Sequence, residues 1–393
     1  MEFVAAVVKK IKPLRALPVA VVFAIALATV SCEGGLFEDS GSATPTATPT
    51  QGAGAFVYVT NFNTARVSRF RRNLITGALT LQGTTAVGAS GGPRGLAIHP
   101  TNQFLYVANA ADDRTYQFEI DLDDGSLMAI GSGFINNSSG ASTDQIAIDP
   151  SGEFAWATNF GNGTISAYTI DPGTGALSDN GEVTSLVNPF GIVVHPTLAL
   201  LFVSDIFLGR VFTYTINTNT GAIAQSGAGA PSLGLFTGSP GLMAISDDGD
   251  FLFVTDVATG VVSSFAIDGG GLVFGGTFST GALGNEPIGI LDLPRFANEY
   301  LFTANQTGNS ISEFTNSAGV LTSVGALPGI AGATGLAADP DAANVYVTNL
   351  NDGTVTQLAV NGPCGQVLCE VQDYNTQSPA NPNSAPSFVA VTQ

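Results

Sequence analysis

The sequence predicts an all-β protein, a seven-bladed β-propeller of four-stranded antiparallel blades. A four-residue segment that starts with a large aromatic residue and ends in Asn or Asp occurs seven times, at intervals of 44 to 51 residues; its aromatic residues are Tyr58, Tyr106, Trp156, Phe202, Phe253, Phe302 and Tyr346. A repeat of this length indicates a propeller or a related array. The chain has 48 glycines and only 11% charged residues, as many short strands joined by tight turns require.

Each repeat can be divided into four strands. The first is short, small and apolar, as in residues 191–196, and the aromatic segment is the second. The third alternates between apolar and polar residues, as in residues 164–170, and a Gly-containing turn leads to a weaker fourth. We expect first strands to surround the central axis and second strands to pack between blades. The closing Asn or Asp is expected to hydrogen-bond the backbone of the next turn.

The C-terminal residues are predicted to close the ring. Seven second strands are present, but only six first strands precede them. Residues 386–391 have the pattern of a first strand and resemble residues 93–98. They should therefore form the innermost strand of the first blade, which leaves no open sheet edge at the seam.

The N-terminus is predicted to direct export. Residues 1–31 contain a basic segment followed by an apolar run, which is typical of a signal peptide. The end of this run, residues 29–32, resembles a bacterial lipobox, so Cys32 is the expected lipidation site, with plain secretion or a retained anchor as alternatives. Residues 32–55 are rich in Thr, Pro, Gly and Ser and should form a disordered tether ahead of a propeller over residues 56–393. We expect a lipoprotein of the bacterial cell envelope or surface, in the outer membrane or periplasm.

Cysteine content and charge limit the possible partners. Cys364 and Cys369 are expected to form a disulfide in an oxidising compartment, the alternative being two reduced thiols. No zinc or haem spacing is present, so no cofactor or metal is expected. A net charge of −19 disfavours nucleic acid and anionic lipid surfaces. The expected partner is an unknown protein or small molecule at the propeller mouth, and the membrane is reached only through a lipid on Cys32.

The candidate functional residues lie where first strands start and second strands end. Their polar groups are Arg94, Asp144, Gln145, Asn188, Asn285, Glu286 and Thr334. Arg94 is expected to form an ion pair with an acid, the alternative being a bound carboxylate. Asp144 and Glu286 could act as a carboxylate pair for acid–base chemistry or for binding a cation. His99 and His195 precede prolines at the ends of first strands and are expected to be turn residues on the opposite face.

The Tyr-Val-Thr-Asn repeat resembles the YVTN family of seven-bladed propellers. It is also similar to the lactonase-type, 6-phosphogluconolactonase-like propellers, in which one blade has Gly-Pro-Arg-His and Tyr-Val-x-Asn-Glu. The nearest stretches here are residues 92–95 and 106–110, in which Arg94 matches, Gly95 replaces the His and Ala110 replaces the Glu. The resemblance implies the fold and, for a lactonase-like enzyme, the candidate catalytic residues Arg94, Asp144 and Glu286.

The fold alone does not decide the function. Because no catalytic constellation is evident, the sequence favours an exported, lipid-anchored binding or interaction module at the cell envelope. The alternative is a lactonase-like hydrolase, of the 6-phosphogluconolactonase or carboxymuconate cyclase type, that uses the central mouth.

Overall fold

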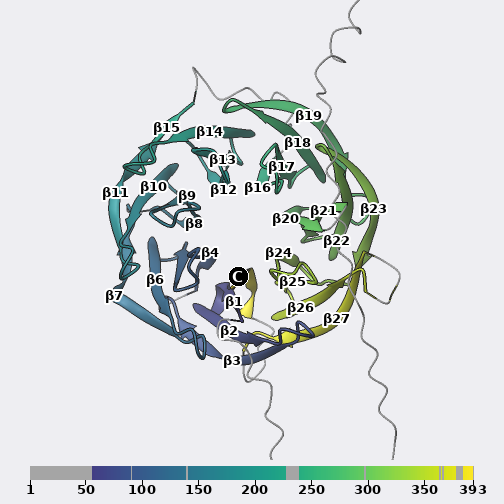
Figure 1. Cartoon of the computed structure of the whole chain (residues 1–393), viewed down its shortest axis with the longest axis horizontal. Coiled ribbons are helices and arrows are strands. Elements are labelled where there is room, and N and C mark those ends of the chain that lie inside the picture. Colours follow the sequence, from purple (N-terminus) through teal and green to yellow (C-terminus); the bar gives the residue numbers. More distant parts are fainter. Residues whose placement is uncertain are drawn as a thin grey trace, which may run out of the picture. The chain divides into compact units, whose positions relative to one another are not determined.

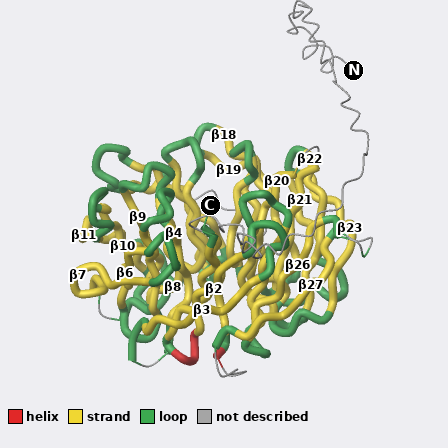
Figure 2. Tube along the Cα trace, turned by 60° about the horizontal axis from the view of Figure 1, so that its bottom comes forward, coloured by secondary structure: helices red, strands yellow, loops and turns green. Residues whose placement is uncertain are grey.

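The computed structural model confirms an all-β, seven-bladed propeller. It describes residues 55–89, 91–138, 140–226, 239–295, 298–362, 364, 367–377 and 384–392. The described strands form seven four-stranded antiparallel sheets around a central axis (Figure 1). Loops join the strands at the two faces of the ring (Figure 2), and the short 3-10 helix η1 (Phe62–Thr64) follows β1. The predicted signal peptide, nearly all of the tether and Cys32 lie outside the described residues.

Each blade is given from its inner to its outer strand. Blade 1 contains β28 (Pro386–Val391), β1 (Phe56–Asn61), β2 (Arg66–Arg72) and β3 (Leu79–Ala86). Blade 2 contains β4 (Pro93–Ile98), β5 (Phe104–Asn109), β6 (Arg114–Ile120) and β7 (Leu127–Asn136). Blade 3 contains β8 (Thr143–Ile148), β9 (Phe154–Asn159), β10 (Thr164–Ile170) and β11 (Leu177–Thr184). Blade 4 contains β12 (Pro189–Val194), β13 (Leu200–Asp205), β14 (Arg210–Ile216) and β15 (Ile223–Gln225).

The remaining blades follow the same order. Blade 5 contains β16 (Pro240–Ile245), β17 (Phe251–Asp256), β18 (Val261–Asp268) and β19 (Gly271–Ser279). Blade 6 contains β20 (Pro287–Arg295), β21 (Asn298–Asn305), β22 (Ser310–Ser317) and β23 (Val320–Pro328). Blade 7 contains β24 (Ala333–Ala338), β25 (Asn344–Asn349), β26 (Thr354–Val360) and β27 (Leu368–Asn375).

The C-terminal strand closes the ring as predicted. β28 pairs antiparallel with β1, with Val389 opposite Val59 and Val391 opposite Val57. Beyond the strand, the backbone N–H of Phe56 donates a 2.8 Å hydrogen bond to the Thr392 hydroxyl. The first blade is therefore built from both ends of the propeller chain, and β1 has no free edge.

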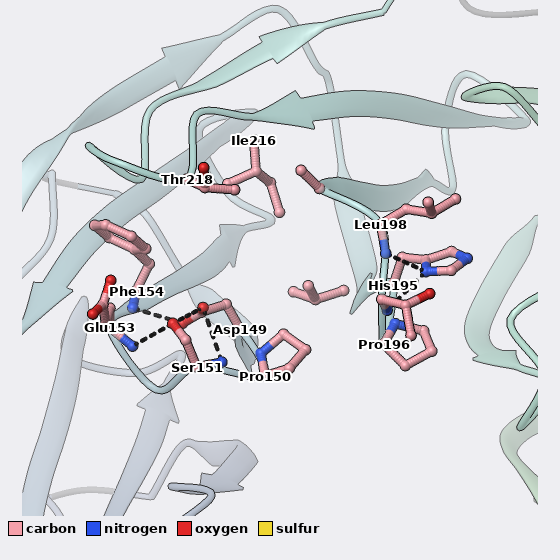
Figure 3. Close-up of a pocket in the computed structure, with 13 residues that line it drawn as sticks. Asp149, Pro150, Ser151, Glu153, Phe154, His195, Pro196, Leu198, Ile216 and Thr218 are labelled. Carbon is pink, nitrogen blue, oxygen red and sulfur yellow. Dashed lines mark hydrogen bonds between the residues drawn. The ribbon is translucent and has the colours of Figure 1, made fainter.

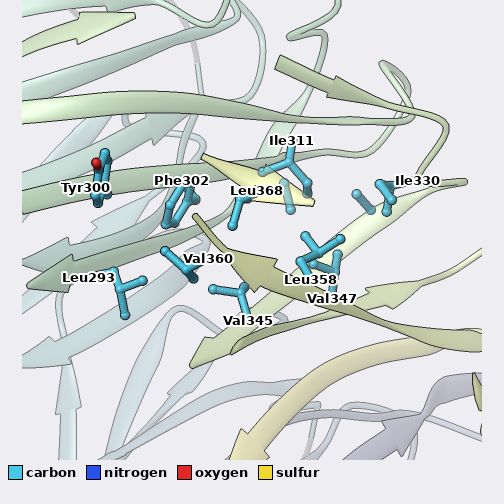
Figure 4. Close-up of a cluster of buried hydrophobic side chains, with 12 residues drawn as sticks. Leu293, Tyr300, Phe302, Ile311, Ile330, Val345, Val347, Leu358, Val360 and Leu368 are labelled. Carbon is cyan, nitrogen blue, oxygen red and sulfur yellow. The ribbon is translucent and has the colours of Figure 1, made fainter. Parts of the chain in front are cut away.

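The aromatic residues of the second strands form the core between blades. All seven are fully buried. The hydroxyl groups of Tyr58, Tyr106 and Tyr346 each donate a 2.7 Å hydrogen bond to a glycine carbonyl in the next blade's outer turn. Trp156 does the same through its indole N–H at 3.1 Å. Figure 4 shows the cluster between blades 6 and 7, where the Phe302 ring packs among aliphatic side chains of both blades.

The Asn and Asp residues that end the second strands have two roles, and the sequence predicted only one. As predicted, Asn109, Asp205 and Asp256 accept hydrogen bonds from backbone N–H groups of adjacent loops. Asn159, by contrast, donates its amide hydrogens to the hydroxyls of third-strand residues five and seven positions later, and two further Asn do the same, namely Asn305 and Asn349. An amide group can donate in this way and a carboxylate cannot.

The predicted disulfide between Cys364 and Cys369 is present, with their Cα atoms 5.7 Å apart. No helix in the described ranges has the length and apolar character needed to span a bilayer.

Candidate functional site

A backbone irregularity recurs at the start of each inner strand. In every blade the pairing with the second strand shifts after the first inner-strand residue. Such a bulge leaves an extra residue unpaired and redirects its side chain. The second residue of each inner strand therefore has no pairing partner on the second strand. We call these seven residues the mouth residues: Arg94, Asp144, Phe190, Gly241, Ile288, Thr334 and Ser387.

The repeated second-strand motif holds the backbone of these mouth residues. Its third residue is Thr or Ser in most blades, and the hydroxyl donates to the carbonyl of the mouth residue in the next blade. Thr60 bonds to Arg94 at 2.7 Å, and Thr158 bonds to Phe190 at 2.8 Å. Ser204, Thr255 and Thr348 make the corresponding bonds in later blades. The motif thus positions the mouth although its own side chains are buried.

A pocket of about 220 Å³ lies at the mouth. Five of the seven mouth residues line it, together with the first residue after some second strands and one further β28 residue. The lining residues are Phe62, Arg94, Phe190, Ile288, Gln306, Thr334, Leu350, Ser387 and Phe388. Because they come from blades 1, 2, 4, 6 and 7, the pocket lies on the central axis and not between two blades.

The charged pair at this mouth joins blades 2 and 3. The Arg94 guanidinium lies 3.3 Å from Asp144 Oδ2 and covers the Phe62 ring at 5.0 Å from its centroid. The side chain of Arg94 is 37% exposed and that of Asp144 is 4% exposed, so Asp144 lies behind Arg94. The Gln145 amide donates a 3.2 Å hydrogen bond to the other carboxylate oxygen of Asp144. Burial raises the pKa of Asp144 above its usual value, and the Arg94 charge opposes this shift.

Gly95, the next residue of β4, is confined by the approach of blade 3. A Cβ at this position would lie 2.7 Å from Gln145 Oε1 and 2.8 Å from the Asp144 carbonyl oxygen. The neighbouring backbone cannot withdraw without moving β8. The position is therefore closed to a side chain, and Gln145 occupies the adjacent space.

The structure brings together only some of the predicted site residues. Thr334 lines the pocket with Arg94, but its hydroxyl is already within 2.8 Å of that of Thr348. Asn188 stabilises a loop, because its amide donates to the Phe160 carbonyl at 2.9 Å. Asn285 and Glu286 are exposed in the loop before β20, outside the pocket lining. Sequence reasoning missed the apolar lining, although aligning the second residue of each first strand would have indicated Phe190, Ile288 and Ser387.

The opposite face has a pocket of about 320 Å³ between blades 3 and 4, shown in Figure 3. His195 lies there and is fully engaged: Nδ1 accepts the Leu198 N–H at 2.9 Å, and Nε2 donates to the Gly249 carbonyl at 2.8 Å. His99 makes the equivalent 2.9 Å bond to Gly152. Both histidines therefore have the predicted turn role.

The inner strand β20 holds a partly buried acid, Asp292, that the sequence reasoning did not single out. Burial, reinforced by the negative charge of Glu299, raises the pKa of Asp292 to about 7. Within the described part of the chain, no group of three or more His, Cys, Asp or Glu side chains is arranged to hold a metal ion.

The fold and the pocket together define a seven-bladed propeller with its candidate site on the central axis. The family model described as "Lactonase, 7-bladed beta-propeller" matches residues 26–138 and 132–233, together just over half of the chain. The chain therefore belongs to this lactonase family of seven-bladed propellers.

Individual relatives are more distant. The 6-phosphogluconolactonase of Bacillus subtilis is 26% identical over 136 residues, which cover 33% of this chain and only 38% of that enzyme. A Bacteroides uniformis protein assigned as a 6-phosphogluconolactonase superposes with a TM-score of 0.71 at 17% identity, covering 86% of this chain and 99% of that one. The periplasmic gluconolactonase of Pseudomonas aeruginosa gives a TM-score of 0.69 at 17% identity with the same coverage. At these identities the structural likeness shows the fold alone.

Proposed function

We propose that this protein is a lactone hydrolase that works at the central mouth. The observation that carries the proposal is the Arg94–Asp144 pair, which places a guanidinium at the pocket and a carboxylate behind it. Membership of the lactonase family supports the same reaction class.

The chemistry follows from the two groups. The lactone carbonyl oxygen accepts a hydrogen bond from Arg94, which stabilises the negative charge that develops when water adds to the carbonyl carbon. Asp144 orients the guanidinium from behind through the 3.3 Å ion pair and does not itself line the pocket. The attacking water loses its proton to solvent at the open mouth, the ring C–O bond breaks, and the leaving oxygen takes a proton from solvent. The product is a hydroxycarboxylic acid, which releases a proton to solvent at neutral pH.

Removing either group should nearly abolish hydrolysis. We expect Arg94→Ala and Asp144→Asn each to lower kcat/KM about 10²- to 10³-fold, measured by acid release from a lactone panel. The wild-type rate should fall as pH drops through the Asp144 pKa, which lies above the usual range, and Asp144→Asn should lose this dependence. A matched control is Asp124→Ala, which removes the acid of the Arg69–Asp124 ion pair away from the mouth and should leave kcat/KM unchanged. Full activity in both mouth variants would overturn the assignment, and a loss in Glu286→Gln instead would place the essential carboxylate in the loop before β20.

A second candidate is a binding module without catalysis. It is favoured by the pocket lining, in which the nine residues include no carboxylate and no imidazole. Ligand binding without turnover of any lactone would support this function over the first.

We also propose that the protein is exported and lipid-anchored through Cys32, supported by the basic and apolar leader of the sequence. In a bacterial host, the wild-type chain should incorporate labelled palmitate and fractionate with membranes. Cys32→Ser should do neither. An unlabelled wild-type chain would contradict the anchor.

A further inference from the structure

We infer that the mouth selects small, uncharged and largely apolar ring compounds and rejects phosphorylated sugars. The choice of lactones as the ring class rests on the proposed function. The preference for apolar over phosphorylated ligands rests on the pocket lining alone and concerns binding, so it can be tested without catalysis.

The pocket surface is mainly apolar. Five of its nine lining residues have aromatic or aliphatic side chains, and three of these are phenylalanines: Phe62, Phe190 and Phe388. Phe190 and Phe388 come from the inner strands of blades 4 and 1, so apolar surface is contributed by separate parts of the ring. Such a lining favours alkyl or aryl carbon and offers little to a polyhydroxylated sugar.

The remaining polar groups have limited capacity for a ligand. The Thr334 hydroxyl lies 2.8 Å from that of Thr348, and the Ser387 hydroxyl donates to the Pro93 carbonyl at 3.2 Å. Arg94 and Gln306 are therefore the polar lining side chains best able to bind a ligand, enough for one carbonyl group but not for a row of hydroxyls.

The charge balance disfavours a phosphate. Arg94 is the one basic residue of the lining, and Asp144 at 3.3 Å offsets its charge. A phosphate monoester carries about −1.5 to −2 charge near pH 7 and needs several donors or cations to replace its hydration. The protein's net charge of −19 adds a repulsive field. A pocket of about 220 Å³ is also smaller than the roughly 300–1,000 Å³ of drug-sized sites, which suits one ring with a short substituent.

The test uses two probes that the protein cannot hydrolyse as lactones. One is a δ-lactam with a short alkyl chain, which has the shape and carbonyl of a lactone. The other is 6-phosphogluconate. With the purified full chain, calorimetry should show at least about 30-fold tighter binding of the lactam. Equal or tighter binding of 6-phosphogluconate would overturn the inference.

Two variants locate the effect. Phe190→Ala should weaken lactam binding about tenfold, whereas Phe207→Ala, at a 73% exposed loop residue outside the pocket, should leave it unchanged. Ile288→Arg, which adds a second cation to the lining, should weaken lactam binding and improve binding of 6-phosphogluconate. Wild-type affinity for the lactam in Phe190→Ala would also contradict the inference, and this readout does not depend on whether Ile288→Arg folds.

The two proposals fail separately. Lactam binding with no lactone turnover would remove the hydrolase and keep the apolar selectivity. Preferential hydrolysis of a phosphorylated lactone would keep the hydrolase and remove the selectivity.

Discussion

Deletion of residues 386–393 should leave the protein without a stable native state. The truncation removes β28, so β1 becomes an open edge at the centre of the ring. It also removes Val389 from the cluster between blades 1 and 7 and the Thr392 partner of Phe56. We expect a loss of about 5 kcal/mol or more, comparable with the whole unfolding free energy of a typical domain. Urea unfolding followed by circular dichroism measures it.

The control restores the strand at a different place in the chain. Val391 pairs with Val57, so the end of β28 lies beside the start of β1. Residues 384–392 placed ahead of Ala55 through a two-residue Asn-Gly turn should therefore form the same pair as a hairpin. This variant should recover most of the lost stability. A truncated protein with the unfolding midpoint of the full chain would show that closure through β28 is not required.

Asp339→Ala should destabilise the same seam by about 3–5 kcal/mol, because it leaves the Arg72 charge buried without its carboxylate. The two groups lie 3.5 Å apart, with only 4% and 2% of their side chains exposed. Asp339 directly follows the inner strand of blade 7, β24, and Arg72 ends the third strand of blade 1, β2, so the pair connects the two blades. Asp339 also accepts hydrogen bonds from the backbone and side chain of Asn344. Guanidinium unfolding at several salt concentrations measures the loss, which should depend little on salt.

Asp124→Ala serves as the comparison. Asp124 lies 3.4 Å from the Arg69 guanidinium, about as close as Asp339 lies to that of Arg72. The Asp124 side chain is 62% exposed, however, so the unfolding midpoint of Asp124→Ala should hardly change. The double variant Arg72→Met/Asp339→Asn should be more stable than Asp339→Ala, since the buried Arg72 charge is removed together with its carboxylate. Equal costs for the two single variants would show that burial of the pair does not matter.

The fold could be predicted from the sequence because the residue patterns that specify its strands and turns are local and are repeated seven times. Each aromatic segment such as residues 58–61 specifies a buried strand and a turn, and seven copies fix the number of blades. The bond from the Tyr58 hydroxyl to the Gly125 carbonyl could not be predicted, because it depends on how blades rotate against each other. The donation of the Asn159 amide to two hydroxyls was missed for a related reason, since both hydroxyls lie on the neighbouring third strand, β10.

The site could be predicted only in part. An ion pair of Arg94 with an acid was expected from the sequence without a named partner, and the structure shows that the partner is Asp144. Phe190 and Phe388 were missed because an apolar residue at a strand start looks like core in a sequence. The bulge that releases Phe190 from the ladder has no clear sequence signal. Glu286 was included because it is polar and precedes an inner strand, but it lies in the exposed loop just before the bulge.

The bulged mouth positions have a consequence for how this protein can evolve. The backbone of several of them is held by a hydroxyl of the preceding blade, as Thr158 holds the carbonyl of Phe190, and this bond does not involve the side chain at the mouth. Exchanging that side chain therefore leaves the anchoring bond in place, except at Gly241, where a Cβ would lie 2.5 Å from the Thr255 hydroxyl. Single substitutions at mouth residues of different blades can therefore change the ligand preference while the hydroxyl-to-carbonyl bonds that hold their backbone are retained. A mutant library confined to the codons of these residues would sample new specificities while retaining foldability.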